Sequence, residues 1–207
     1  DHIMPMASAI WSSPAVAMNR FPARSFIAFY NNHGLLKFRN RPQWRTVTGG
    51  AQNYVSRMIR TGTFKTITDL AITSVVRKPT GIEIRDAAGN GMHFDQVVLA
   101  CPADAALGLL KDADLQETLI LGKFRYSDSK TVLHTDRRHM PKRRHLWASW
   151  NYLCSSDAGS TAGASCTYWM NRLQSLKTET DLMVTLNATG EIDPESILYR
   201  TDYRHPI

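Results

Sequence analysis

Residues 81–94 read GIEIRDAAGNGMHF, and this stretch indicates that the chain builds a β-sheet. Ile82 and Ile84 alternate with charged residues, which is the period-two pattern of a strand with one buried face. Asn90-Gly91 is the strongest β-hairpin signal in the chain, because both residue types tolerate positive φ angles. The stretch therefore predicts two antiparallel strands joined by a tight turn.

Further strand-like segments lie on both sides of this hairpin. Residues 66–76 are rich in β-branched side chains. Residues 97–100 form a continuous apolar run, as expected for a strand buried on both faces. The remaining strand candidates are 43–47, 130–136, 145–153, 164–171, 182–187 and 196–203. We therefore expect a mostly antiparallel sheet of five or more strands in the later part of the chain.

The first third of the chain instead carries helical patterns. We expect helices there over residues 4–19, with a new start at Pro14, and over 21–34 and 51–62, and a further helix beyond the first third over 103–110. In the third of these, apolar residues recur at helical spacing and form one stripe. The fold class predicted is α+β: a mostly antiparallel mixed sheet with helices packed on one side.

Composition narrows the class of protein. The 207 residues carry a formal net charge of +7 and 43% hydrophobic residues, which suits one large domain or two small ones. No apolar run is long enough to span a membrane, and the start has no signal-peptide pattern. Cys101, Cys154 and Cys166 are unclustered, which favours free thiols and a cytoplasmic location.

Both ends of the sequence interrupt structural patterns. The chain begins at Asp1 within helix-forming sequence and stops at His205-Pro206-Ile207, directly after a strand-like run. We therefore expect a fragment of a longer protein.

Residues 134–153, HTDRRHMPKRRHLWASWNYL, combine a basic run with histidines and aromatic residues. A nucleic-acid groove would need the cations and the aromatic rings on one face. The aromatic residues alternate with small ones, which is more typical of a sheet core. No pair of Cys or His residues has the spacing of a metal site. We expect no nucleic acid and no metal, but two sheet strands joined by a charged, solvent-facing turn.

Seven stretches of the sequence together carry a resemblance to a known protein family. They are PMASAIWSS (5–13), FPARSFIAFYNNHGLL (21–36), QWRTVTGGAQNYV (43–55), VVLACPADAALGLL (97–110), the 134–153 stretch, YWMNRLQSL (168–176) and LMVTLN (182–187). Together the sequence resembles the flavin-containing amine-oxidase-like family, and within it the branch described as predicted NAD/FAD-binding proteins. The resemblance covers nearly the whole chain.

This resemblance implies a specific organisation and chemistry. Family members interleave a substrate domain with a Rossmann-type FAD domain that opens on G-x-G-x-x-G, and they pass a hydride from substrate to flavin. The glycine motif does not occur in these 207 residues. The resemblance assigns 1–48 and 111–207 to the substrate-binding domain, and 49–110 to a segment that returns to the FAD domain. We expect FAD in a complete protein, but little FAD binding or activity from this chain alone.

Site residues follow from the same resemblance and from the strand pattern. The positions expected near FAD are Gly49, Gly50, Val75, Cys101 and Pro102. The positions expected to line a substrate cavity are His33, Trp147, Trp150, Asn151 and Tyr152. Gly49-Gly50 before a helix could also approach an anion, although a tight turn is the simpler interpretation. No general base can be singled out.

Two hypotheses about partners remain. In the first, the chain holds a small amine or an apolar substrate, and an exposed FAD-domain face causes self-association. In the second, the chain is a non-catalytic binding module whose basic turn, residues 137–145, takes an acidic partner. Flavin absorbance of a full-length protein would support the first, and salt-sensitive binding the second.

Overall fold

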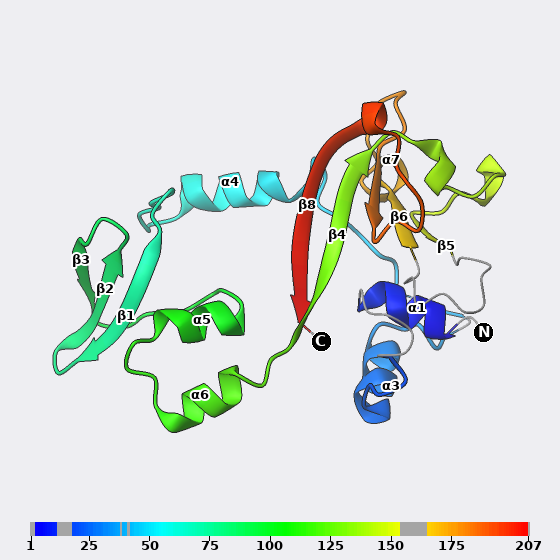
Figure 1. Ribbon diagram of the computed structural model, residues 1–207. Helices are drawn as coiled ribbons and strands as arrows, with labels where there is room; N and C mark the ends of the chain where they lie inside the picture. Colours follow the sequence, from blue (N-terminus) through cyan, green and yellow to red (C-terminus); the bar gives the residue numbers. More distant parts are fainter. Residues whose placement is uncertain (1–2, 12–17, 38, 41, 154–164, 207) are drawn as a thin grey trace. The chain divides into compact units, whose positions relative to one another are not determined.

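The computed structural model describes residues 3–11, 18–37, 39–40, 42–153 and 165–206, and it has an α+β fold (Figure 1). Two compact units are distinguished: Asp1–Arg60 with Ser127–His205, and a second unit made mainly of Thr61–Tyr126. The α+β class is confirmed, and the strands form two antiparallel sheets rather than one mixed sheet. The assignment of substrate-binding and FAD-binding roles to the two parts of the chain stays a prediction.

The second unit contains a three-stranded sheet in the order β1-β2-β3. Its strands are β1 (Ile72–Lys78), β2 (Gly81–Asp86) and β3 (Gly91–Phe94). The predicted hairpin is confirmed, with Ile84 opposite Met92. The positive φ angle falls on Gly89, at 86°, rather than on Asn90-Gly91. The Asp86 carboxylate causes this shift, because it accepts hydrogen bonds from the backbone and side-chain N–H groups of Asn90.

The expected buried strand over residues 97–100 is wrong. These residues are not in a strand, and the side chain of Val98 is 90% exposed. A continuous apolar run is buried on both faces only when neighbouring strands and covering layers exist, and the described residues supply no strand partner here. Pro102 then caps helix α5 (Ala103–Leu109), as predicted.

The rest of the second unit is tied to β1. Helix α6 (Leu115–Leu121) begins with a capping box, in which the Asp114 carboxylate accepts from the Glu117 N–H and the Glu117 carboxylate accepts from the Asp114 N–H. The Arg77 guanidinium on β1 forms ion pairs with Asp112 and Glu117. These contacts hold the segment between α5 and α6 against the edge of the sheet.

The first unit contains a five-stranded sheet in the order β5-β6-β7-β4-β8. Its strands are β4 (Tyr126–His134), β5 (Trp150–Leu153), β6 (Ser165–Trp169), β7 (Met183–Leu186) and β8 (Ile197–Pro206), and the short helix α7 (Met170–Leu173) follows β6. The sequence predicted five strands in this third of the chain, and five are observed. Figure 1 shows β4 and β8 as long strands lying side by side.

The basic stretch does not form the expected pair of neighbouring strands. Strand β5 pairs with β6, whereas β4 pairs with β7 and lies next to β8. Two 3₁₀ turns, Arg137–His139 and Arg144–Leu146, occupy the connection, so β5 starts only at Trp150. These turns break the expected alternation. Trp147 is buried, whereas Leu146 and Trp150 are 58% and 42% exposed.

The helices of the first unit are α1 (Ile3–Ile10), α3 (Ala23–Asn32) and α4 (Ala51–Thr61). They confirm the predicted patterns, although the helix expected at Pro14 lies outside the described residues. Gly34 follows α3 with a φ angle of 64°, as a helix-ending glycine does. The strand expected over residues 43–47 is not observed: these residues are in neither a helix nor a strand. The apolar stripe of α4 is exposed at Tyr54, Val55, Met58 and Ile59.

Candidate functional site

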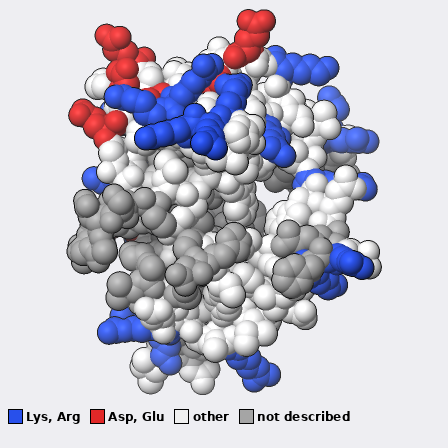
Figure 2. Space-filling model, turned by 90° about the vertical axis from the view of Figure 1, so that its right-hand side faces the viewer, with Lys and Arg blue, Asp and Glu red and all other residues white. Residues whose placement is uncertain are grey.

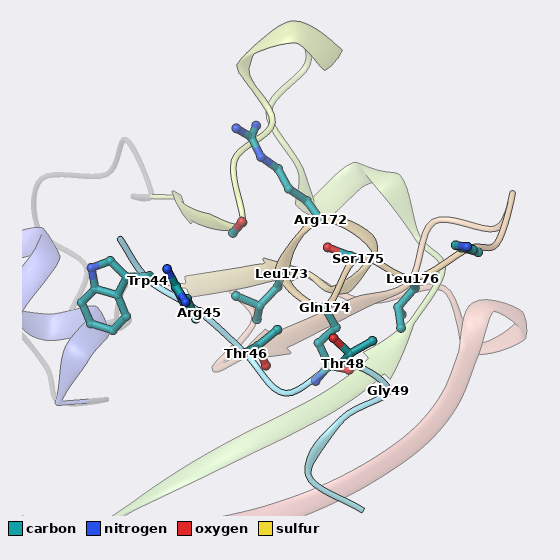
Figure 3. Close-up of a pocket in the computed structure, with 12 residues that line it drawn as sticks. Trp44, Arg45, Thr46, Thr48, Gly49, Arg172, Leu173, Gln174, Ser175 and Leu176 are labelled. Carbon is teal, nitrogen blue, oxygen red and sulfur yellow. The ribbon is translucent and has the colours of Figure 1, made fainter. Parts of the chain in front are cut away.

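An open groove of about 770 Å³ lies in the first unit (Figure 3). Three parts of the chain form it: residues 44–49, Ser149 at the start of the β5 region, and residues 172–177. The lining side chains are Trp44, Arg45, Thr46, Thr48, Gly49, Ser149, Arg172, Leu173, Gln174, Ser175, Leu176 and Lys177. This volume is typical of small-molecule sites in proteins.

The wall over residues 172–177 is fixed by hydrogen bonds from Asn171. The Asn171 side chain donates to the carbonyl of Thr180 at 2.8 Å and accepts from the N–H of Leu182 at 2.8 Å. The Leu176 N–H donates to the Asn171 carbonyl at 2.9 Å, and Ser175 between them has a positive φ angle of 52°. The chain therefore makes a tight loop after α7 that presents its side chains to the groove.

The opposite wall ends in the Gly49-Gly50 turn. The φ angles of Gly49 and Gly50 are 79° and 86°, and the Gly50 N–H donates to the Val47 carbonyl at 2.9 Å. The Asn53 side-chain amide donates to the Thr48 carbonyl at 2.8 Å. The simpler interpretation of the two glycines, a tight turn into α4, is therefore the one observed.

The groove combines cationic side chains with apolar ones. Arg45, Arg172 and Lys177 line it, and none of its twelve lining residues is Asp or Glu. The Arg172 guanidinium donates to the Trp147 carbonyl at 2.9 Å, which fixes its position. In Figure 3, Leu173 lies between the two walls, and the Arg172 side chain runs away from it.

None of the residues predicted to bind substrate lines this groove. Trp147 is buried against Met140 and Met183, and its indole N–H donates to the Pro141 carbonyl at 2.7 Å. The buried Asn151 side chain bonds to backbone atoms of Ala148, at 2.9 and 2.7 Å. Both side chains therefore serve the fold in this structure.

The other three predicted substrate residues have different surroundings. The Trp150 ring packs edge-on against Tyr168, and Tyr152 is half-buried on the same strand. The His33 ring stacks with Trp44 at a centroid distance of 6.1 Å, and its Nδ1 atom lies 2.8 Å from the Phe29 carbonyl. His33 and Trp147, whose carbonyl accepts from Arg172, thus contact groove residues without lining the groove.

The residues predicted to lie near FAD fall in both units. Gly49 lines the groove, with Gly50 next to it. Val75 is buried within the second unit, where it forms a parallel bridge with Leu110. The Cys101 thiol is exposed, and Pro102 is the N-cap residue of α5. Their roles toward a cofactor stay predictions.

A row of buried polar side chains crosses β4, β7 and β6. The Nε2 atom of His134 lies near the hydroxyl of Thr185, and this hydroxyl lies 2.8 Å from that of Thr167. Burial lowers the pKa of His134 to about 4, and the nearby His139 acts in the same direction, whereas Asp136 opposes it. The row therefore holds a neutral imidazole in the interior.

Several cations of the basic turn form ion pairs with acidic residues of the same chain. The Arg138 guanidinium binds both oxygens of Asp136 and holds the pKa of that carboxyl well below its usual range, although burial opposes this effect. Arg137 and Arg144 both form ion pairs with the buried Asp181. Figure 2 shows Lys and Arg gathered on this side of the molecule with acidic side chains among them. These pairs do not favour the acidic-partner hypothesis.

Other kinds of site have little support in the part of the chain that the structure describes. There, no three His, Cys, Asp or Glu side chains come together as metal ligands would. No described helix is both long and apolar enough to cross a bilayer. Burial raises the pKa of the Cys166 thiol to about 11. Cys154 lies outside the described residues.

The fold is similar to parts of larger enzymes of known structure. One is a CLA-producing fatty acid isomerase from P. acnes, with a TM-score of 0.53, 14% identity, and coverage of 76% of this chain and 40% of that one. Another is a candidate protoporphyrinogen oxidase from Exiguobacterium sp. 255-15, with a TM-score of 0.50, 16% identity, and coverage of 77% and 35%. The chain thus spans less than half of either protein. No family model and no curated protein matches the sequence.

Proposed function

We propose that the chain is the substrate-binding region of an FAD-dependent oxidoreductase of the amine-oxidase-like class. The observation that carries this proposal is the fold likeness, over about three quarters of the chain, to two proteins named as an isomerase and an oxidase. The family resemblance of the sequence points the same way. The substrate would be a small amine or an apolar molecule.

The described residues do not form a complete FAD site. A dinucleotide is held by a glycine-rich turn between a strand and a helix N-terminus within a parallel sheet. The Gly49-Gly50 turn precedes α4, but no strand leads into it, and both sheets are antiparallel. FAD would supply the hydride acceptor when bound. We therefore place the main FAD contacts in another part of a longer polypeptide, and we expect this chain alone to be inactive.

Two exposed apolar surfaces support a further domain. Val98 lies in a segment that is in neither a helix nor a strand, and it is 90% exposed. The apolar stripe of α4 contains no buried residue, and its Met58 is 56% exposed. Apolar surface of this kind commonly marks an interface. An FAD domain would cover such surfaces in a complete enzyme.

Flavin content tests the proposal. The chain of residues 1–207 and the product of the complete coding region that contains it are purified in parallel. We expect the complete product to be yellow, with flavin absorbance that persists through gel filtration, and the chain alone to be colourless and to leave FAD fluorescence unchanged on titration. A complete product without flavin, even after incubation with FAD, contradicts the proposal.

A further inference from the structure

The groove is lined by cationic side chains, and no acidic side chain in its lining balances their charge. Arg45 and Lys177 stand on opposite segments of the lining, and no described residue forms an ion pair with either. Arg172 adds a third cation, which its bond to a backbone carbonyl leaves charged. A groove of this kind attracts an anion.

The same groove offers apolar surface between its cations. Leu173 and Leu176 are half-buried, and Trp44 is 65% exposed although it stands at the groove. In Figure 3, the two leucines follow the length of the groove, and Trp44 with Arg45 lies at one end. An apolar ligand that covers the accessible parts of these three side chains buries apolar surface, which favours binding.

We propose that this groove binds an amphipathic monocarboxylate, a long-chain fatty acid. The hydrocarbon chain lies along Leu173 and Leu176, the carboxylate pairs with Arg45 at one end of the groove, and Lys177 adds to the positive field that attracts the carboxylate. The hydroxyl groups of Thr46 and Thr48 supply hydrogen-bond donors on the same wall. The inference names a substrate class for the proposed function and rests on it for catalysis alone, because binding needs no flavin.

Charge and shape favour this ligand over a polyanion. A nucleotide or nucleic acid needs donors grouped around each phosphate, whereas Arg45 and Lys177 come from different walls. A single carboxylate needs one such cation. The apolar surface between them then accounts for the rest of the affinity, which grows with each methylene that the ligand buries.

The test compares oleate, oleyl alcohol and oleylamine, each below its aggregation limit. Binding to the purified chain is followed by calorimetry and by tryptophan fluorescence. We expect oleate to bind about three- to ten-fold more tightly than the alcohol, since one exposed ion pair and a second cation on the lining contribute that much, and oleylamine to bind most weakly. The advantage of oleate is expected to shrink at high salt.

Variants locate the site. Arg45→Gln and Lys177→Gln are each expected to weaken oleate binding about two- to five-fold and to leave the alcohol unchanged. Leu173→Asn weakens both ligands. Arg24→Gln removes an exposed cation on α3 that does not line the groove, and it is expected to bind like wild type. Circular dichroism confirms that each variant is folded.

Two results would overturn the inference: equal affinity for oleate and oleyl alcohol, or unchanged oleate affinity in both cation variants. The flavin test is separate. Oleate binding by a protein whose complete gene product lacks flavin would leave the groove assignment standing and reject the oxidoreductase. Flavin in the complete product, together with ligand binding that does not depend on charge, would support the oxidoreductase and reject the groove assignment.

Discussion

The Nε2 atom of His134 lies 2.7 Å from the Oγ1 atom of Thr185, and both side chains are fully buried. The Asp136 N–H donates to the Nδ1 atom of the same imidazole at 3.1 Å. Nδ1 therefore accepts a hydrogen bond and carries no proton. In the neutral ring the proton is then on Nε2, which donates a hydrogen bond to the threonine hydroxyl. This bond joins the neighbouring strands β4 and β7 through a neutral histidine.

The neutral His134 predicts a pH dependence of stability. Its pKa of about 4 in the folded state lies below the value of about 6.5 expected in the unfolded chain. The unfolded chain therefore binds the proton first as the pH falls, and the free energy of unfolding decreases between pH 6.5 and 4 by about 3 kcal/mol. Urea unfolding measured across this range checks the loss.

Two variants separate this effect from other titrations. His134→Gln is expected to be less stable at neutral pH but to lose most of the dependence between pH 6.5 and 4. His145→Gln removes an exposed histidine from the basic turn, so the dependence should remain. A wild-type unfolding free energy that stays flat over this window would show that His134 is not held neutral. All five tryptophans lie in the first unit, so their fluorescence follows this unit.

The two glycines before α4 are expected to differ in their tolerance of a side chain. A Cβ atom on Gly49 would lie 2.2 Å from the Asn53 Nδ2 atom, whereas one on Gly50 would meet nothing within 4 Å. Both have positive φ angles, so each alanine variant loses about 1 kcal/mol from backbone strain. Gly49→Ala should lose about 1 kcal/mol more, because the Asn53 amide must leave the Thr48 carbonyl.

Urea titration of both variants measures this difference. In an Asn53→Ala background the extra loss at Gly49 should disappear, because the neighbouring side chain is gone. Equal losses for both glycines in the wild-type background would contradict the geometry of the turn.

Two tryptophans that the sequence placed together at a substrate cavity should respond differently to mutation. Trp147→Phe removes the hydrogen bond to Pro141 and part of the packing against Met183, and it should lower the free energy of unfolding by about 2–3 kcal/mol. Trp150→Phe alters a ring that is 42% exposed and should cost less than about 1 kcal/mol. Chemical denaturation followed by far-ultraviolet circular dichroism compares the two. A larger loss at Trp150 would contradict the observed burial.

Self-association through α4 is our further proposal, since the helix exposes an apolar stripe. The chain alone should show a concentration-dependent mass in sedimentation velocity, because Met58 and its neighbours can bury apolar area against a second copy. Met58→Glu should shift the protein toward monomer. Gln52→Glu places the same charge change on the same exposed helix and should have little effect on the mass. A wild-type chain that stays monomeric at all concentrations would exclude this interface.

Local patterns predicted much of the fold correctly. The hairpin of β2 and β3 and the helices α3 and α5 depend on nearby residues, such as Gly34 and Pro102 at helix boundaries. The candidate site was harder to predict from the sequence, because most of its residues belong to no recognisable motif. RLQSLK, residues 172–177, has no recognisable spacing, and only its loop after α7 brings it to the groove.

Errors occurred where distant residues override the local pattern. The alternation in residues 145–153 predicted one strand, but the observed strand starts only at Trp150, after a 3₁₀ turn whose Arg144 pairs with the distant Asp181. The apolar run at 97–100 predicted a buried strand, yet burial also requires neighbours that the described residues do not provide. Neither condition can be read from the segment itself.

The sequence alone thus determined the positions of most helices and strands, because hydrophobic period, turn residues and helix caps act over a few positions. The tertiary structure decided which faces are buried and where a groove opens. Trp44 and Leu173 are far apart in the sequence and line one groove only in the folded chain. Hydrogen bonds from Asn53 and Asn171 to nearby backbone shape the two segments that carry them.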